Sequence, residues 1–197
     1  ALLSVVGQDF DGQELIAAAE VLGLNTEYLY RSQDLPTDRY MAIEGSNGLI
    51  AAIADAHSLE AAGDKILRPL ADGRLGRAER PFQGLIALDG NLTVGLLAQI
   101  ATSPLFERAD LRIAPASPGK AERLLPLLGH LGATLYVNVE EAELILGRDF
   151  NDAGAAASAL VERGANRVVV THGPKAAAKA DVDGCVLALP PAVLASR

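Results

Sequence analysis

The stretch TLYVNVEEAELILG, residues 134–147, gives the clearest indication of how this chain folds. Its apolar, partly β-branched first half stops at the polar Asn138, and an acidic segment with helical spacing follows at once. This pattern predicts a strand that runs directly into a helix. The unpaired N–H groups in the first turn of a helix favour negative charge, and α/β proteins often place phosphate groups at such ends.

The predicted first turn carries its own carboxylates, Glu140, Glu141 and Glu143. They would repel a bare phosphate, so a phosphate site here is better explained if a divalent cation lies between them. Mg²⁺ is the first choice, because it prefers oxygen ligands and retains waters. Acidic residues in a first turn are also ordinary partners of the helix dipole. Spacing alone leaves both interpretations open.

The composition indicates a globular chain. Of the 197 residues, 50% are hydrophobic, which is enough for a buried core. The net charge is −8 without a basic cluster, so we expect no nucleic-acid partner. Cys185 is the single cysteine, which excludes an internal disulfide and favours a reducing compartment, the cytoplasm. No apolar run approaches the roughly 20 residues of a membrane span, so no membrane association is expected.

Strands and helices alternate along most of the chain. Strands are expected at 1–7, 84–88, 111–114, 167–171, 176–180 and 184–189, and helices at 13–22, 93–102, after Ser117, and at 152–162. Between the first two strands, Asp9 and Asp11 are interpreted as loop and helix N-cap residues rather than site residues.

Residues 25–55 change to a period of two, with a hairpin turn predicted at 46–48. They predict a small antiparallel sheet that projects from a core made of residues 1–24 and 56–197. The expected fold is a three-layer α/β/α domain with a mainly parallel sheet and this antiparallel flap.

The segment NVEEAELILG closely resembles the N-x-x-E region of the ribokinase-like (PfkB) carbohydrate kinases, with Asn138 and Glu141 at its two motif positions. About thirty residues later, RVVVTHG is similar to the strand that leads into the T-x-G nucleotide loop of that family. The resemblance implies that Asn138 and Glu141 arrange Mg²⁺ and phosphates through water. It also implies that Thr171 and Gly173 bind ATP.

By the same resemblance, the flap at 25–55 is the lid over the sugar, and PTDRYMAIE looks like the lid of pseudouridine kinases. Arg39 and Tyr40 are then candidates for substrate contact or for a homodimer seam. The alternative is that Tyr40 packs on its own sheet and that Arg39 is solvated.

Three further residues are candidates for ligand contact. LDGNL is similar to a segment of pseudouridine-kinase-like members, so Asp89 and Asn91 are candidates for binding substrate hydroxyls, with an Asx turn as the alternative. Lys120 is a candidate phosphate contact, and a solvent-facing helical lysine is its alternative.

The chain also departs from the family pattern. Relatives often have Asn or Asp where Ala114 stands, and P-K-A follows T-H-G where a glycine is usual. The G-A-G-D segment, which carries the catalytic base, is expected beyond Arg197, and a Gly-Gly and Asn sugar-binding segment before Ala1. We therefore expect the interior of an ATP-dependent sugar or nucleoside kinase, with pseudouridine as the first candidate substrate. The alternative is a binding or regulatory protein that keeps the fold without the chemistry.

Overall fold

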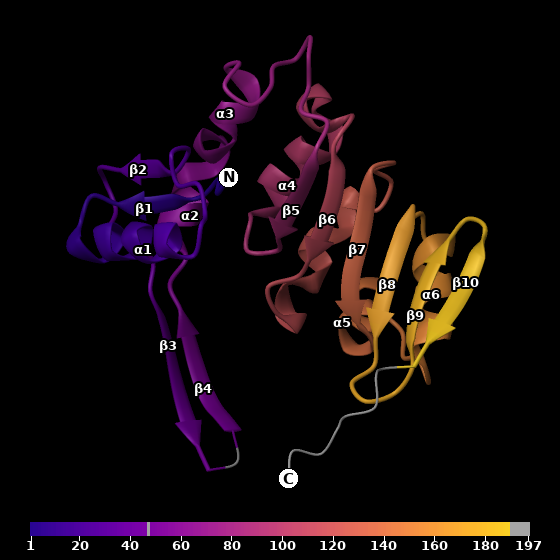
Figure 1. Cartoon of the computed structure of the whole chain (residues 1–197). Helices are drawn as coiled ribbons and strands as arrows, with labels where there is room; N and C mark the ends of the chain where they lie inside the picture. Colours follow the sequence, from indigo (N-terminus) through magenta and orange to yellow (C-terminus); the bar gives the residue numbers. More distant parts are fainter. Residues whose placement is uncertain (47, 190–197) are drawn as a thin grey trace. The chain divides into compact units, whose positions relative to one another are not determined.

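The chain forms two compact units, Ala1–Gly76 and Arg77–Arg197 (Figure 1). The computed structural model describes residues 1–46 and 48–189. Within these ranges, no helix combines the length and the apolar character needed to cross a membrane. Each unit has its own strands and its own buried side chains.

A six-stranded sheet with the order β10-β9-β8-β7-β6-β5 forms the centre of the second unit. Its strands are β5 (Leu85–Asp89), β6 (Asp110–Ala114), β7 (Ala133–Asn138), β8 (Arg167–Thr171), β9 (Ala177–Asp181) and β10 (Gly184–Ala188). Strands β5 to β8 are parallel, whereas β9 and β10 form an antiparallel hairpin at the end of the sheet. The predicted mainly parallel sheet and its terminal hairpin are confirmed.

The helices of this unit lie in the connections between the parallel strands. They are α4 (Val94–Thr102), η2 (Pro104–Phe106), η3 (Pro118–Leu127), α5 (Val139–Leu146) and α6 (Ala153–Glu162). Successive strands advance in one direction across the sheet, so right-handed crossovers place their helices on the same face. Figure 1 shows α4, α5 and α6 behind the sheet. Strand residues that face them, such as Leu111, Leu135 and Val168, are fully buried.

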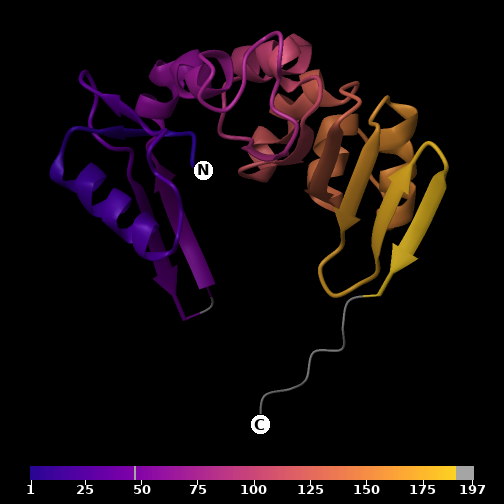
Figure 2. The same cartoon turned by 45° about the horizontal axis from the view of Figure 1, so that its top comes forward.

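The first unit contains shorter elements. They are β1 (Val5–Gly7), α1 (Phe10–Val21), β2 (Tyr30–Ser32), β3 (Tyr40–Gly45), β4 (Gly48–Ala54), α2 (His57–Ala62), η1 (Gly63–Leu67) and α3 (Arg68–Ala71). Strands β3 and β4 form the predicted antiparallel ribbon, seen as two long strands in Figure 2.

Two sequence predictions for this unit need correction. The antiparallel flap was expected to begin at residue 25, but it begins at Tyr40, because β2 pairs in parallel with β1 rather than with the ribbon. The first helix starts at Phe10, three residues before the predicted start, because Asp9 caps it. Asn47, in the predicted hairpin turn, lies outside the described residues.

Asp9 joins the start of α1 to a distant loop. Its carboxylate accepts hydrogen bonds from the N–H of Gly12 at 2.8 Å, the N–H of Thr37 at 2.7 Å and the hydroxyl of Thr37 at 2.6 Å. The same hydroxyl oxygen accepts a hydrogen bond from the N–H of Gly7. The interpretation of Asp9 as an N-cap is confirmed. These bonds, led by the Thr37 hydroxyl, lower the pKa of Asp9 from 3.8 to about 2.

The lowered pKa predicts an acid-sensitive first unit. Because the folded-state pKa of Asp9 lies below the unfolded value, its carboxylate stabilises this unit above pH ~4 and loses that effect as the pH falls toward 2. We expect the denaturant midpoint of the wild type to fall more steeply over this range than that of Asp9→Asn. The variant should be less stable at pH 7, because an amide NH₂ would face the Thr37 N–H. Asp34→Asn, at an exposed carboxylate, is the control. Parallel curves for wild type and Asp9→Asn would contradict this prediction.

Candidate active site

Polar residues gather where the parallel strands of the second unit end. Asn138 ends β7 and Thr171 ends β8, and the two are register partners. Asp89 ends β5 and is the register partner of Ala114, which ends β6. Ligands of open parallel sheets bind beyond the carboxyl ends of the strands. Three of the predicted site residues, Asn138, Thr171 and Asp89, therefore lie along the edge where a ligand is expected.

A pocket of about 400 Å³ opens beside Asn138 and Thr171. Its walls come from the start of α5, the loop after α5 and the turn after β8. The lining residues are Asn138, Val139, Glu140, Glu143, Phe150, Thr171, His172 and Gly173. The structure thus brings together Asn138, Thr171 and Gly173, three of the residues expected to bind the nucleotide.

Asn138 and Glu141 form a capping box at the start of α5. The Asn138 side-chain oxygen accepts a hydrogen bond from the N–H of Glu141, and the Glu141 carboxylate accepts one from the N–H of Asn138, both at 2.8 Å. The predicted change from strand to helix therefore has a local cause. Glu141 is only 9% exposed and does not line the pocket, whereas its neighbours Glu140 and Glu143 do. Its carboxylate acts directly on the backbone of Asn138.

The loop after α5 is held against the pocket by its own contacts. Gly147 ends the helix in the left-handed conformation, at φ 66°, which favours glycine. The N–H of Phe150 then donates to the Glu143 carboxylate at 2.8 Å. The guanidinium of Arg148 lies 4.8 Å from the centre of the Phe150 ring. Phe150 was not singled out from the sequence, because no motif connects it with Asn138.

Three residues of the pocket lining have side-chain oxygens of the kind that Mg²⁺ prefers, namely Asn138, Glu140 and Glu143. The Asn138 oxygen also accepts a hydrogen bond from the N–H of Glu141, and one Glu143 oxygen accepts one from the N–H of Phe150. Over the described ranges, no group of three or more His, Cys, Asp or Glu residues is arranged to hold a metal.

Asp89 and Asn91 build the turn after β5. The N–H of Asn91 donates to the Asp89 carboxylate at 2.7 Å, so the Asx turn considered as the alternative is present. The Lys120 ammonium donates to the Asn91 side-chain oxygen at 2.6 Å, and Arg123 donates to the Asn91 backbone oxygen at 3.1 Å. Lys120 is absent from the lining of the pocket at Asn138. It was expected with the nucleotide residues, but the structure places it with Asn91.

Gly90 lets this turn approach the loop after β6. Its N–H donates to the carbonyl of Ala114 at 2.9 Å. A Cβ atom at Gly90 would lie 2.7 Å from the Cα of Pro115 and 2.9 Å from the N of Ala116. Both neighbours are backbone atoms, so only glycine fits here without a shift of one of the two loops.

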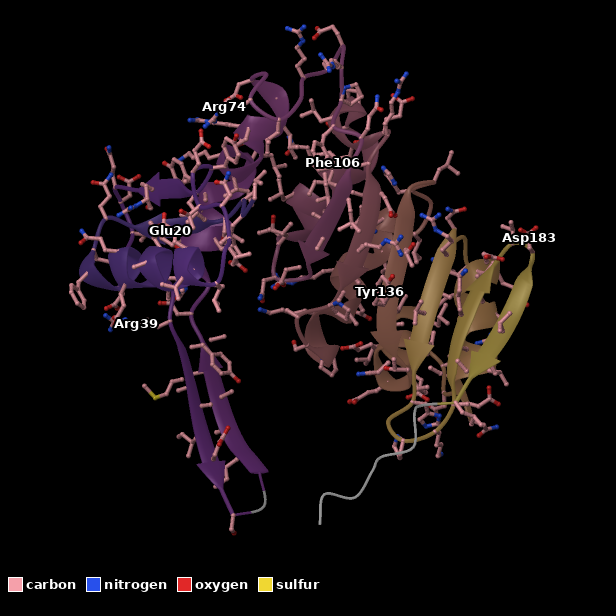
Figure 3. The ribbon with its side chains drawn as sticks, in the orientation of Figure 1. Glu20, Arg39, Arg74, Phe106, Tyr136 and Asp183 are labelled. Atoms are coloured by element: carbon pink, nitrogen blue, oxygen red, sulfur yellow. The ribbon has the colours of Figure 1, made fainter. Side chains whose placement is uncertain are left out.

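The two predicted lid residues belong to the first unit. A nitrogen of the Arg39 guanidinium lies 2.6 Å from the carboxylate of Asp11 in α1, and the Arg39 side chain is 76% exposed (Figure 3). Tyr40 begins β3 and is 65% exposed. Both side chains are therefore accessible, and their roles toward a substrate or a second copy stay predictions.

Comparison with known proteins establishes the family. The profile of the pfkB family carbohydrate kinases matches residues 1–195. The chain belongs to this family. The match includes all the residues that form the pocket and the turn after β5, so the predicted resemblance is confirmed.

Individual pfkB relatives agree with this assignment. The chain is 29% identical over 173 residues to the uncharacterized sugar kinase YeiI of Escherichia coli (strain K12), covering 86% of this chain and 45% of that protein. The chain therefore spans about half the length of this curated relative. A carbohydrate kinase from Agrobacterium tumefaciens superposes with a TM-score of 0.73 at 22% identity, over 96% of this chain and 59% of that one.

A second solved structure, ribokinase from Thermotoga maritima, gives a TM-score of 0.70 at 19% identity, over 98% of this chain and 60% of that one. These two likenesses show the fold. The predicted ribokinase-like α/β fold is confirmed.

Proposed function

We propose that the protein is an ATP-dependent, cytoplasmic kinase that phosphorylates a primary hydroxyl of a sugar or nucleoside. Pseudouridine is the first candidate substrate. The observation that carries the proposal is the pairing of Asn138 with Thr171 at the carboxyl edge of the sheet, beside a pocket, in a chain of the pfkB family. The single cysteine supports the proposed compartment.

In this proposal the pocket receives the phosphates of ATP. Asn138, Thr171 and Gly173 contact the nucleotide, and Glu141 holds Asn138 in place while its charge acts on the hydrated ion. A bound Mg²⁺ supplies positive charge that offsets the phosphates and the nearby carboxylates of Glu140 and Glu143.

The sugar side of the proposal uses other residues. Asp89 and Asn91 bind substrate hydroxyls, and Lys120, which is bonded to Asn91, holds that turn and contributes positive charge toward the transferred phosphate. Arg39 and Tyr40 contact the substrate from the lid. We assign the catalytic base to no residue of this chain.

An activity screen tests the proposal. The full-length protein is purified and incubated with ATP and Mg²⁺ together with ribose, pseudouridine, uridine or adenosine, and release of ADP is followed. We expect pseudouridine to give the highest kcat/KM, with a singly phosphorylated product in the mass spectrum. ATP binding without turnover of any substrate would favour the non-catalytic alternative. Failure to bind ATP would contradict the nucleotide site.

The ribbon of β3 and β4 supports a proposed homodimer. The register places Met41, Ile43 and Ile53 on one face, and all three side chains are more than half exposed. A two-stranded ribbon is marginally stable alone, and exposed apolar faces are typical of protein contacts. A second copy of the ribbon would cover this face.

The homodimer predicts a difference between the two faces of the ribbon. Ile43→Glu should shift the sedimentation coefficient from dimer toward monomer, because it places a charge in the proposed contact. Ala42→Glu adds the same charge on the opposite face and should leave the dimer intact. The same sedimentation coefficient for both variants would argue against an interface on this face.

A further inference from the structure

His172 lines the pocket with an imidazole ring that none of the proposed nucleotide contacts uses. It stands between Thr171 and Gly173 in the turn after β8, and it lines the pocket. Its Nδ1 atom is almost fully shielded from solvent and has no hydrogen-bond partner among the described residues. A polar atom that is shielded from water and has no partner costs free energy. No hydrogen bond to Nδ1 compensates that cost in this orientation of the ring.

The remaining lining shows what kind of group would complete the site. Glu140 and Glu143 bring carboxylates, and Phe150 brings an aromatic ring. Carboxylates repel the phosphates of a nucleotide, so the ligand depends on the hydrogen-bond donors of the pocket. Of the lining side chains, Asn138, Thr171 and His172 can donate, and His172 alone can also carry a positive charge.

We propose that His172 is a nucleotide-binding residue. When ATP enters, the imidazole turns about its side-chain bonds, and Nδ1–H donates a hydrogen bond to an oxygen of the nucleotide. This turn gives a partner to an atom that lacks one. The inference rests on the proposed function, because it assigns the pocket to ATP. It adds a contact from the His172 side chain to those that Thr171 and Gly173 of the same turn are proposed to make with the nucleotide.

Three substitutions separate this role from a structural one. Asn places its amide nitrogen close to the position of Nδ1, Gln places its own close to Nε2, and Leu has no donor. Isothermal titration with ATP and Mg²⁺ should show a loss of about tenfold in affinity for His172→Leu and His172→Gln, and about threefold or less for His172→Asn. Without ATP, His172→Leu should melt at the same temperature as the wild type or higher, because it removes the unpartnered nitrogen. A structural role would instead lower the melting temperature.

The outcomes distinguish the inference from the proposed function. If His172→Leu and His172→Gln both bind ATP as tightly as the wild type does, the proposed role of His172 is overturned, and the nucleotide site is unaffected. A wild type that binds no ATP overturns the proposed function, and the inference with it. If His172→Leu does not fold, the comparison of His172→Asn with His172→Gln decides, and equal affinity in these two variants overturns the contact through Nδ1.

Discussion

In the full-length enzyme, Glu141→Gln is expected to lower kcat/KM for ATP-dependent phosphorylation by at least about tenfold, equivalent to about 1.4 kcal/mol of transition-state stabilisation. The Gln side chain keeps an oxygen that can accept the hydrogen bond from the Asn138 N–H, so the capping box survives. The substitution removes the negative charge that we propose acts on a hydrated ion. The free energy of unfolding should therefore change by less than about 1 kcal/mol.

Two further variants make this experiment specific. Glu141→Ala removes the charge and also the hydrogen bond to Asn138, so it should cost about 1 kcal/mol of stability in addition to the loss of activity. Glu162→Gln, at an exposed carboxylate at the end of α6, is the matched control and should keep wild-type kinetics. Rates are measured across a Mg²⁺ titration. If Glu141→Gln follows the wild-type curve, the carboxylate has no role in organising the ion.

Gly90→Ala is expected to destabilise the second unit by about 1–3 kcal/mol and to raise KM for the sugar substrate. The added methyl group would lie 2.7 Å from the Cα of Pro115 and 2.9 Å from the N of Ala116, and neither backbone atom can move without its loop. The shift would displace Asp89 and Asn91, the residues proposed to bind substrate hydroxyls.

A second glycine on the same segment provides the control. Gly95 lies in α4, and a Cβ atom there would meet nothing within 4 Å. Gly95→Ala should raise stability by up to about 1 kcal/mol, because alanine favours the helix. Chemical denaturation of both variants, together with KM for the sugar, tests the contrast. An unchanged midpoint and KM for Gly90→Ala would show that the two loops are free to separate.

Much of the fold could be predicted from the sequence because many of its causes are local. The change from β7 to α5 depends on Asn138 and Glu141, three residues apart, and α6 begins where Asp152 accepts from the N–H of Ala155. The parallel order of strands follows from helices placed between them. The predicted nucleotide residues Asn138 and Thr171 meet because both end neighbouring strands.

Local sequence is enough to place the ends of strands and the starts of helices, since capping side chains act on backbone groups within four residues. Which side chains meet over longer distances depends instead on the tertiary structure. Lys120 bonds Asn91 across 29 residues, and Thr37 bonds Asp9 across 28. Such pairs depend on how loops from different strands approach one another, which no short-range pattern encodes.

Which side chains line the pocket also depends on the tertiary structure. Successive residues of a helix point in directions about 100° apart. Sequence spacing could mark the acidic turn at 140–143, but it could not say which of its carboxylates faces a ligand. The local capping box turns Glu141 to the backbone of Asn138, whereas the packing of α5 against its neighbours places Glu140 and Glu143 in the pocket lining.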